Sequence, residues 1–83
     1  MGRRRSDDVI ANADIVTIGE LVRLTGVRYS TLKHYTEENM IEYLQEEENL
    51  TRRYDRVKAM ERIDKILKLR LEGLSILEIK ERL

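Results

Sequence analysis

Residues 17–36 read TIGELVRLTGVRYSTLKHYT, and this stretch decides the fold. Thr17 and Glu20 have capping-box spacing, in which a hydroxyl and a carboxylate three residues later bind the unpaired amides at the start of a helix. Gly26 supplies the positive φ that ends such a helix after about two turns. The spacing therefore predicts a short first helix that begins at Thr17.

A second helical period begins at Tyr29. Leu32 and Tyr35 fall on its inward side. Asn39 tolerates the left-handed conformation and is expected to end the helix. The outward side is expected to carry Tyr29, Ser30, Lys33 and His34. Two short helices joined by a short glycine-containing turn are typical of a helix-turn-helix, whose second helix enters the major groove of DNA.

The periodicity changes after the second helix. Residues 41–44 and 50–54 are compatible with two short strands, because they hold apolar and β-tolerant side chains. Residues 46–49, which separate them, have the composition of a polar turn. This pattern predicts a β-hairpin that follows the two helices.

Two further helices are predicted toward the C-terminus. Asp55 is a candidate N-cap for the longest helix, and Gly73 is expected to follow its end. Its inward stripe is predicted to consist of Val57, Met60, Ile63, Leu67, Leu71 and Leu74. Ser75 and Glu78 repeat the capping-box spacing and begin a last helix. Since the sequence stops at Leu83 without a C-cap, we expect either a trimmed chain or an apolar edge that meets a partner.

Residues 1–14 show no helical or strand period, and we expect a flexible arm there, followed by a single domain formed by residues 15–83. The arm carries Arg3, Arg4 and Arg5 ahead of its aspartates. Two interpretations stay open for these arginines, a solvated tail or a segment that seeks nucleic acid.

The neutral total charge hides a strong segregation along the sequence. Among 83 residues, 16 Lys and Arg balance 16 Asp and Glu, so the total predicts no affinity for a polyanion. Residues 17–36 and 49–56 each have a net charge of +2, whereas residues 37–48 hold six glutamates and no basic residue. If the second helix and the hairpin share a face, the side chains positioned to neutralise phosphates are Arg28, Lys33, Arg52 and Arg53.

The composition excludes several classes of function. The absence of Cys excludes a disulfide framework and fits a reducing setting, the cytoplasm, where a DNA-binding protein would associate with the nucleoid. One His and no Cys exclude a metal sensor, and no cofactor is expected. Ser30 and His34 lie one helical turn apart, but without an orienting acid or a pocket they do not predict an enzyme. No apolar run reaches the length of a membrane span.

The chain resembles the DNA-binding domain of MerR-family transcriptional regulators in several segments that occur in the right order. The segments are IGEL at 18–21, TGV at 25–27, TLKHY at 31–35, Arg52 and Tyr54 at the wing, and LEGLS at 71–75 with Glu78 and Ile79 at the junction of the last two helices. The resemblance covers residues 17–83, which is nearly everything but the arm.

The resemblance implies a mainly α, winged helix-turn-helix fold with four helices and a two-stranded β-hairpin wing. It implies that a recognition helix at about residues 29–38 enters the major groove while the wing contacts flanking phosphates, usually from both subunits of a dimer. Tyr29, Lys33 and His34 would then face base edges or nearby phosphates. Arg52 would hold the DNA backbone from the wing. Taken together, the resemblance and the charge pattern predict seven DNA-binding residues: Arg28, Tyr29, Ser30, Lys33, His34, Arg52 and Arg53.

Some positions depart from the family's pattern. Lys33 stands where arginine is commoner, so a point charge replaces a bidentate fork and phosphate contact is favoured over guanine recognition. Asn39 replaces the usual glycine, Val22 replaces a common alanine, and the proline that often enters the wing is absent. Glutamates 46–48 would be repelled by phosphate by about 1 kcal/mol, so the wing tip is not expected to touch DNA. The family's effector domain and subunit-pairing helix are missing, so no small-molecule effector site is expected.

Two other functions stay open beside regulation by a DNA-bound dimer. The short chain also fits a plasmid-maintenance or recombination accessory protein that assembles side by side on repeated sites of double-stranded DNA. Outside DNA binding, it fits a winged-helix protein–protein interaction module that docks through the acidic residues 37–48 and the apolar edge at Leu83. The symmetry of the DNA site separates the first two functions, and the salt dependence of binding separates the third.

Overall fold

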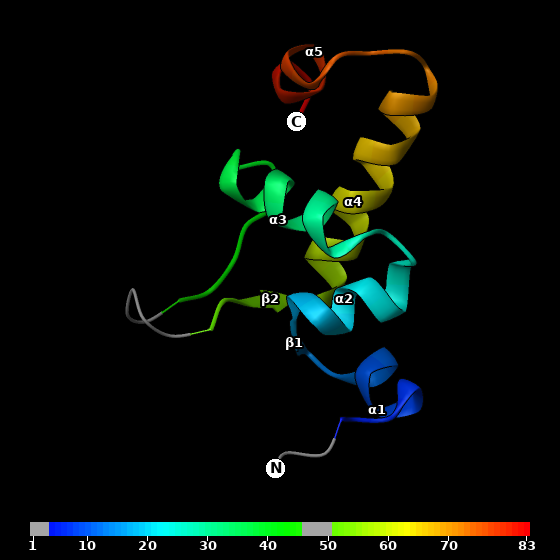
Figure 1. Cartoon of the computed structure of the whole chain (residues 1–83), viewed down its shortest axis with the longest axis vertical. Helices are drawn as coiled ribbons and strands as arrows, with labels where there is room; N and C mark the ends of the chain where they lie inside the picture. Colours follow the sequence, from blue (N-terminus) through cyan, green and yellow to red (C-terminus); the bar gives the residue numbers. More distant parts are fainter. Residues whose placement is uncertain (1–3, 46–50) are drawn as a thin grey trace.

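The computed structural model describes residues 4–45 and 51–83. The elements in these residues are α1 (Asp7–Asn12), β1 (Ile15–Thr17), α2 (Ile18–Thr25), α3 (Tyr29–Glu37), β2 (Arg53–Asp55), α4 (Arg56–Leu71) and α5 (Ile76–Glu81). Figure 1 shows α1 and α5 at opposite ends of the molecule, with α4 running from the sheet toward α5. The fold is mainly helical, as predicted, but the described residues hold five helices rather than four.

Local capping chemistry sets the bounds of α2 and α3. The Thr17 hydroxyl accepts a hydrogen bond from the Glu20 amide at 3.3 Å, and the Glu20 carboxylate accepts one from the Thr17 amide at 2.9 Å. Gly26 follows α2 with φ 73°, and its amide donates to the Val22 carbonyl. Asn39 has φ 60° just after α3. The predicted bounds of α2 and the predicted end of α3 are therefore confirmed, because these signals act within a few residues. Helix α3 also begins at Tyr29 as predicted, although its N-cap, Arg28, makes no side-chain capping bond.

Helix α1 lies in the segment where the sequence shows no helical period. The Ser6 hydroxyl caps it by accepting a hydrogen bond from the Val9 amide at 3.3 Å, and Ile10 is fully buried. The expectation of no regular structure in residues 1–14 is therefore wrong for α1. A six-residue helix that buries one side chain has no repeated apolar interval, so its period is invisible in the sequence.

The two strands are far apart in the sequence. β1 and β2 pair antiparallel, with Val16 opposite Tyr54 and Thr17 opposite Arg53. On the other side of β2, Leu44 forms a single bridge with Arg53 through two backbone hydrogen bonds of 2.6 and 2.9 Å. The predicted strand at 41–44 is wrong apart from Leu44, because Ile41 is buried in the core and the segment makes no other ladder bond.

Of the predicted β-hairpin, the described residues thus show only the pairing of Leu44 with Arg53 at the base of the wing. The predicted second strand, 50–54, is shifted, and the described strand is β2. The pairing partner β1 was not predicted, because its three residues lie next to a capping signal and show no alternation of their own. The predicted polar turn at 46–49 lies outside the described residues.

Helix α4 buries a stripe that only partly matches the predicted one: Ile63 is buried as predicted, and Met60, Leu67 and Leu74 are partly buried against the core. Its N-cap is Asp55, whose carboxylate accepts from the Lys58 amide at 3.1 Å, and Gly73 follows its end with φ 91°. The buried residues are Ala59, Ile63, Ile66 and Leu69. Val57 and Leu71 were predicted inward but are 49% and 88% exposed. The centre of the buried face is therefore shifted toward Ala59, Ile66 and Leu69, none of which was in the predicted stripe.

The last helix and the core complete the fold. Ser75 and Glu78 form the predicted capping box, and Ile79 is fully buried. Tyr35, which was predicted to face inward, lies in the same core as Tyr54. With α2 and α3 as the helix-turn-helix, β2 and Leu44 at the base of the wing, and α4 and α5 packed beside them, the architecture is a winged helix-turn-helix.

Candidate nucleic-acid interface

Helix α3 has one buried side and one exposed side. Leu32, Tyr35 and Thr36 are at most 1% exposed. The exposed side carries Tyr29, Ser30, Lys33 and His34, and Arg28 is exposed at the N-cap. The structure therefore brings five of the predicted site residues together on one surface, and Tyr29 is the most prominent apolar side chain there, 53% exposed. Their exposure agrees with the helical period, whereas their contact with DNA stays a prediction.

The base of the wing holds the other two predicted residues. The Arg52 guanidinium lies over the Tyr43 ring, 4.8 Å from its centroid, and Arg52 is half-buried. Arg53 is exposed, while its backbone joins β2 to Leu44. Stacking on an aromatic ring restricts the arginine's rotamers, so Tyr43 orients Arg52. The sequence did not indicate this partner, because the two residues lie on opposite sides of the wing.

Two buried hydroxyl groups connect α3 to the elements on either side of it. The Thr36 hydroxyl donates to the Leu32 carbonyl at 2.9 Å, so the Tyr54 hydroxyl, 2.9 Å away, donates to Thr36. The Tyr35 hydroxyl accepts from Arg70 of α4 at 2.8 Å. Burial raises the pKa of Tyr54, and the hydrogen bond with Thr36 opposes this shift. The inward side of α3 is thus hydrogen-bonded to both β2 and α4.

A groove runs between α3 and the turn that joins α4 to α5. Its polar lining residues include Ser30, His34, Arg70 and Ser75. Arg70 adds a cation beside the exposed side of α3, and the sequence analysis did not assign it to the site. Its position in the last turn of α4 indicates at most a favourable interaction with the helix dipole.

The basic residues nearest the N-terminus are engaged by carboxylates. Arg5 binds Glu20 through two hydrogen bonds of 2.6 and 2.7 Å and also donates to the Ile15 carbonyl. Arg23, which the charge pattern counted as basic, is paired with Asp7 at 2.6 Å. Arg5 is therefore attached to α2 through a long-range ion pair rather than lying in a free solvated tail, and a contact of the arm with nucleic acid stays a prediction. Arg3 lies outside the described residues.

Glu20 has two roles at the start of α2. Its carboxylate caps the helix and binds Arg5, and its side chain is 12% exposed. The hydrogen bond from Arg5 is the largest cause that lowers the pKa of Glu20 to about 2, with Thr17 contributing further and burial opposing the shift. The pair therefore makes folding sensitive to acid.

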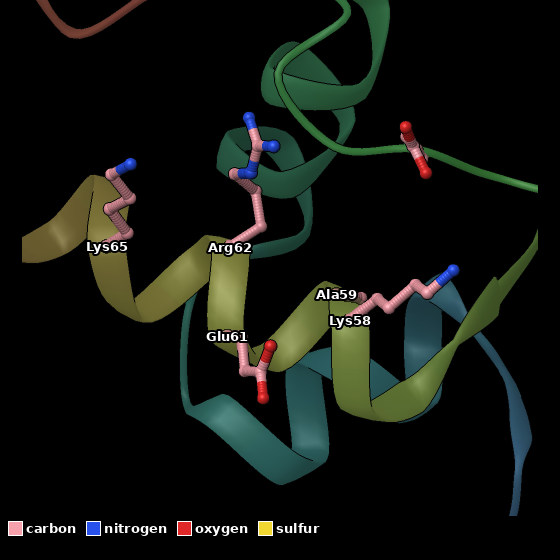
Figure 2. A pocket seen from close by; sticks show the side chains of 6 residues that line it. Lys58, Ala59, Glu61, Arg62 and Lys65 are labelled. Carbon is pink, nitrogen blue, oxygen red and sulfur yellow. The ribbon is translucent and has the colours of Figure 1, made fainter. Parts of the chain in front are cut away.

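A second basic surface lies on α4, away from the residues predicted to bind DNA. Lys58, Arg62 and Lys65 line one pocket with Glu42 and Glu61. Figure 2 shows Arg62 and Lys65 projecting from the same side of α4 and Glu61 from the opposite side. None of the seven predicted site residues lines this pocket. The mixed charges of this surface distinguish it from the exposed side of α3.

Searches for other sites gave two negative findings that apply to residues 4–45 and 51–83. None of the helices there combines the length and the apolar composition needed to cross a membrane. Within the same residues, no three His, Cys, Asp or Glu side chains are grouped closely enough to hold a metal ion.

Comparison with known proteins gives one match. A family model described as MerR HTH family regulatory protein matches residues 16–83. The match begins within β1, includes both helices of the helix-turn-helix, and continues through α4 and α5. Helix α1 precedes it. No curated protein and no solved structure matches the chain.

Proposed function

The chain belongs to the MerR HTH family of regulatory proteins, and from this premise we propose that it binds a specific double-stranded DNA sequence through α3 and the base of the wing. The resemblance of the sequence to this family is confirmed by the match over residues 16–83. The family is one of DNA-binding regulators and not of enzymes. Regulation of transcription is therefore the function that the geometry supports best.

The observation that carries the proposal is the two-sided character of α3. Its buried side fixes the helix on the domain, and its other side is exposed and polar over more than two turns. A helix of this kind fits the major groove, which admits one α-helix and presents donors and acceptors to it. We assign Lys33 to phosphate, because an ammonium group acts as a point charge. We assign Tyr29 to base edges, because its side chain is 53% exposed at the start of the helix.

The base of the wing supplies flanking phosphate contacts in this proposal. Arg52 is oriented by Tyr43 before DNA arrives, so less conformational entropy is lost when it binds phosphate. Arg53 is exposed next to it on β2. His34 lines the groove on the other side of α3. The contacts on both flanks would set the register of the recognition helix along the duplex.

We further propose that two copies bind together. A two-fold dimer requires a palindromic DNA site, whereas side-by-side assembly, as expected for a recombination or plasmid-maintenance accessory protein, requires direct repeats.

The alternative of a protein-docking module differs from DNA binding in how its affinity depends on salt. Phosphate binding releases counterions and weakens steeply with salt, while an apolar contact does not.

The test is selection of bound duplexes from a random pool at two salt concentrations, using the full chain. We expect enrichment of one motif, and fewer bound molecules at the higher salt. A palindrome in the selected motif would support the dimer, and direct repeats would support side-by-side assembly. Recovery of no motif at either salt concentration would contradict sequence-specific DNA binding.

A further inference from the structure

We infer that Arg70 is a positioning residue that sets the orientation of the recognition helix α3 through the hydroxyl of Tyr35. This inference rests on the proposed function and adds a residue that determines specificity without facing the bases. Arg70 lies in the last turn of α4, and its guanidinium donates to the Tyr35 hydroxyl at 2.8 Å. Tyr35 is the neighbour of His34 on α3 and is 1% exposed.

The hydroxyl of Tyr35 has a partner only because Arg70 reaches it. A phenylalanine ring would fill the same space in the core, but a buried phenol needs a hydrogen-bond partner. Arg70 itself is exposed, so its hydrogen bond contributes little to the stability of the fold. The bond instead constrains the direction of the Tyr35 side chain, which is packed in the core on the inward side of α3. Its main effect is therefore on where α3 lies relative to the turn between α4 and α5.

The next residue of α3 makes the corresponding connection on the other flank. Thr36 is hydrogen-bonded to Tyr54 of β2, next to the wing. Adjacent residues thus hold α3 to both sides, one to the wing base and one to α4. When the bond between Tyr35 and Arg70 is lost, core packing still holds α3 on the domain, but the hydrogen bond to the wing side has no counterpart on the α4 side, and α3 can shift slightly against α4. Recognition of base edges tolerates displacements of only about 0.5 Å, so specific binding should suffer first.

The experiment compares Tyr35→Phe, Arg70→Ala and the double variant with the wild-type full chain. Binding is measured to the selected duplex and to an unrelated duplex over a range of salt. Lys65→Ala is the control, since it also removes an exposed cation from α4 but one with no tyrosine partner in the described residues. Thermal melting and the amide resonances of α3 in the free chain are recorded for every variant.

We expect Tyr35→Phe to weaken binding to the selected duplex about three- to tenfold, the size of one lost hydrogen bond, with binding to the unrelated duplex and the salt slope unchanged. Arg70→Ala should give the same loss, and the double variant no further loss, because both changes remove the same bond. Both single variants should shift the same α3 amides and keep a near-native melting temperature. Lys65→Ala should leave the α3 amides in place.

Three results would overturn the inference. The first is an affinity of Tyr35→Phe for the selected duplex equal to that of the wild type. The second is a loss of affinity in the double variant that equals the sum of the two single losses. The third is a lower salt slope in Arg70→Ala with no effect of Tyr35→Phe, which would make Arg70 a phosphate contact. If the wild-type chain binds no duplex, the proposed function fails, and the α3 amide shifts still decide whether Arg70 and Tyr35 are coupled.

Discussion

Lys33 is the residue whose charge is most directly available to DNA, because it is exposed on α3 and has no ion pair in the described residues. Lys33→Ala should weaken binding to many sequences by about fivefold and lower the salt slope by about one, as expected for one lost phosphate contact. Titrations at several salt concentrations measure both. Lys68→Ala is the control, since Lys68 is paired with Asp64 on α4. Equal salt slopes for Lys33→Ala and wild type would remove Lys33 from the interface.

Tyr29 should affect which sequence is bound. Its side chain is 53% exposed at the start of α3, where the residues of a recognition helix contact base edges. Tyr29→Ala should therefore change the motif recovered from a random pool, with a discrimination loss of about 1 to 3 kcal/mol at the contacted base. Val57→Ala removes a similarly exposed apolar side chain from α4 and should leave the motif unchanged. An identical motif for Tyr29→Ala and wild type would refute the assignment.

At the scale of elements, α1 and α2 are joined by Arg5 with Glu20 and by Asp7 with Arg23. The pKa of Glu20 is lowered from the ordinary 4.5 to about 2. As pH falls through this window the unfolded chain takes up the proton first, so stability is present above pH 4.5 and is lost toward pH 2. The loss should be about 1 kcal/mol, because Arg5 is 42% exposed and solvent screens the pair.

Chemical denaturation between pH 6 and pH 2 measures this loss. Glu20→Gln cannot be protonated there, so its stability should depend less on pH in that window than that of the wild type. Glu61→Gln is the matched control, because Glu61 is an exposed carboxylate with no ion pair in the described residues. Parallel pH profiles for Glu20→Gln and wild type would show that the ion pair does not stabilise the fold.

The elements also show which features a sequence can reveal. Both ends of α2, the C-terminal end of α3 and the beginning of α5 follow from local signals that act over three or four residues, and they were predicted correctly. Strand β1 depends on a partner distant in the sequence, and α1 has only the local N-cap at Ser6 without an apolar period, so neither element was predicted. The buried stripe of α4 depends on the packing angle of its neighbours. Periodicity indicated a helix there but not its rotation.

At the scale of the whole molecule, the candidate site was predictable in part. The exposed side of α3 follows from the helical period, because residues that are not needed in the core face outward. Tyr43 and Arg70 could not be assigned in this way, because their roles arise from contacts across the wing and between helices. The net charge of zero gave no indication of an interface. Residues 17–36 and 49–56, each with a net charge of +2, did indicate an interface, although Arg23 in the first segment is paired with Asp7.

The most direct test of DNA binding through α3 is a titration of the isotope-labelled chain with the selected duplex, followed by amide chemical shifts. We predict that the largest shifts fall on the exposed side of α3, from Tyr29 to His34, and at Arg52 and Arg53. Shifts that cluster instead around Arg62 on α4, or no shifts with any duplex, would contradict the account.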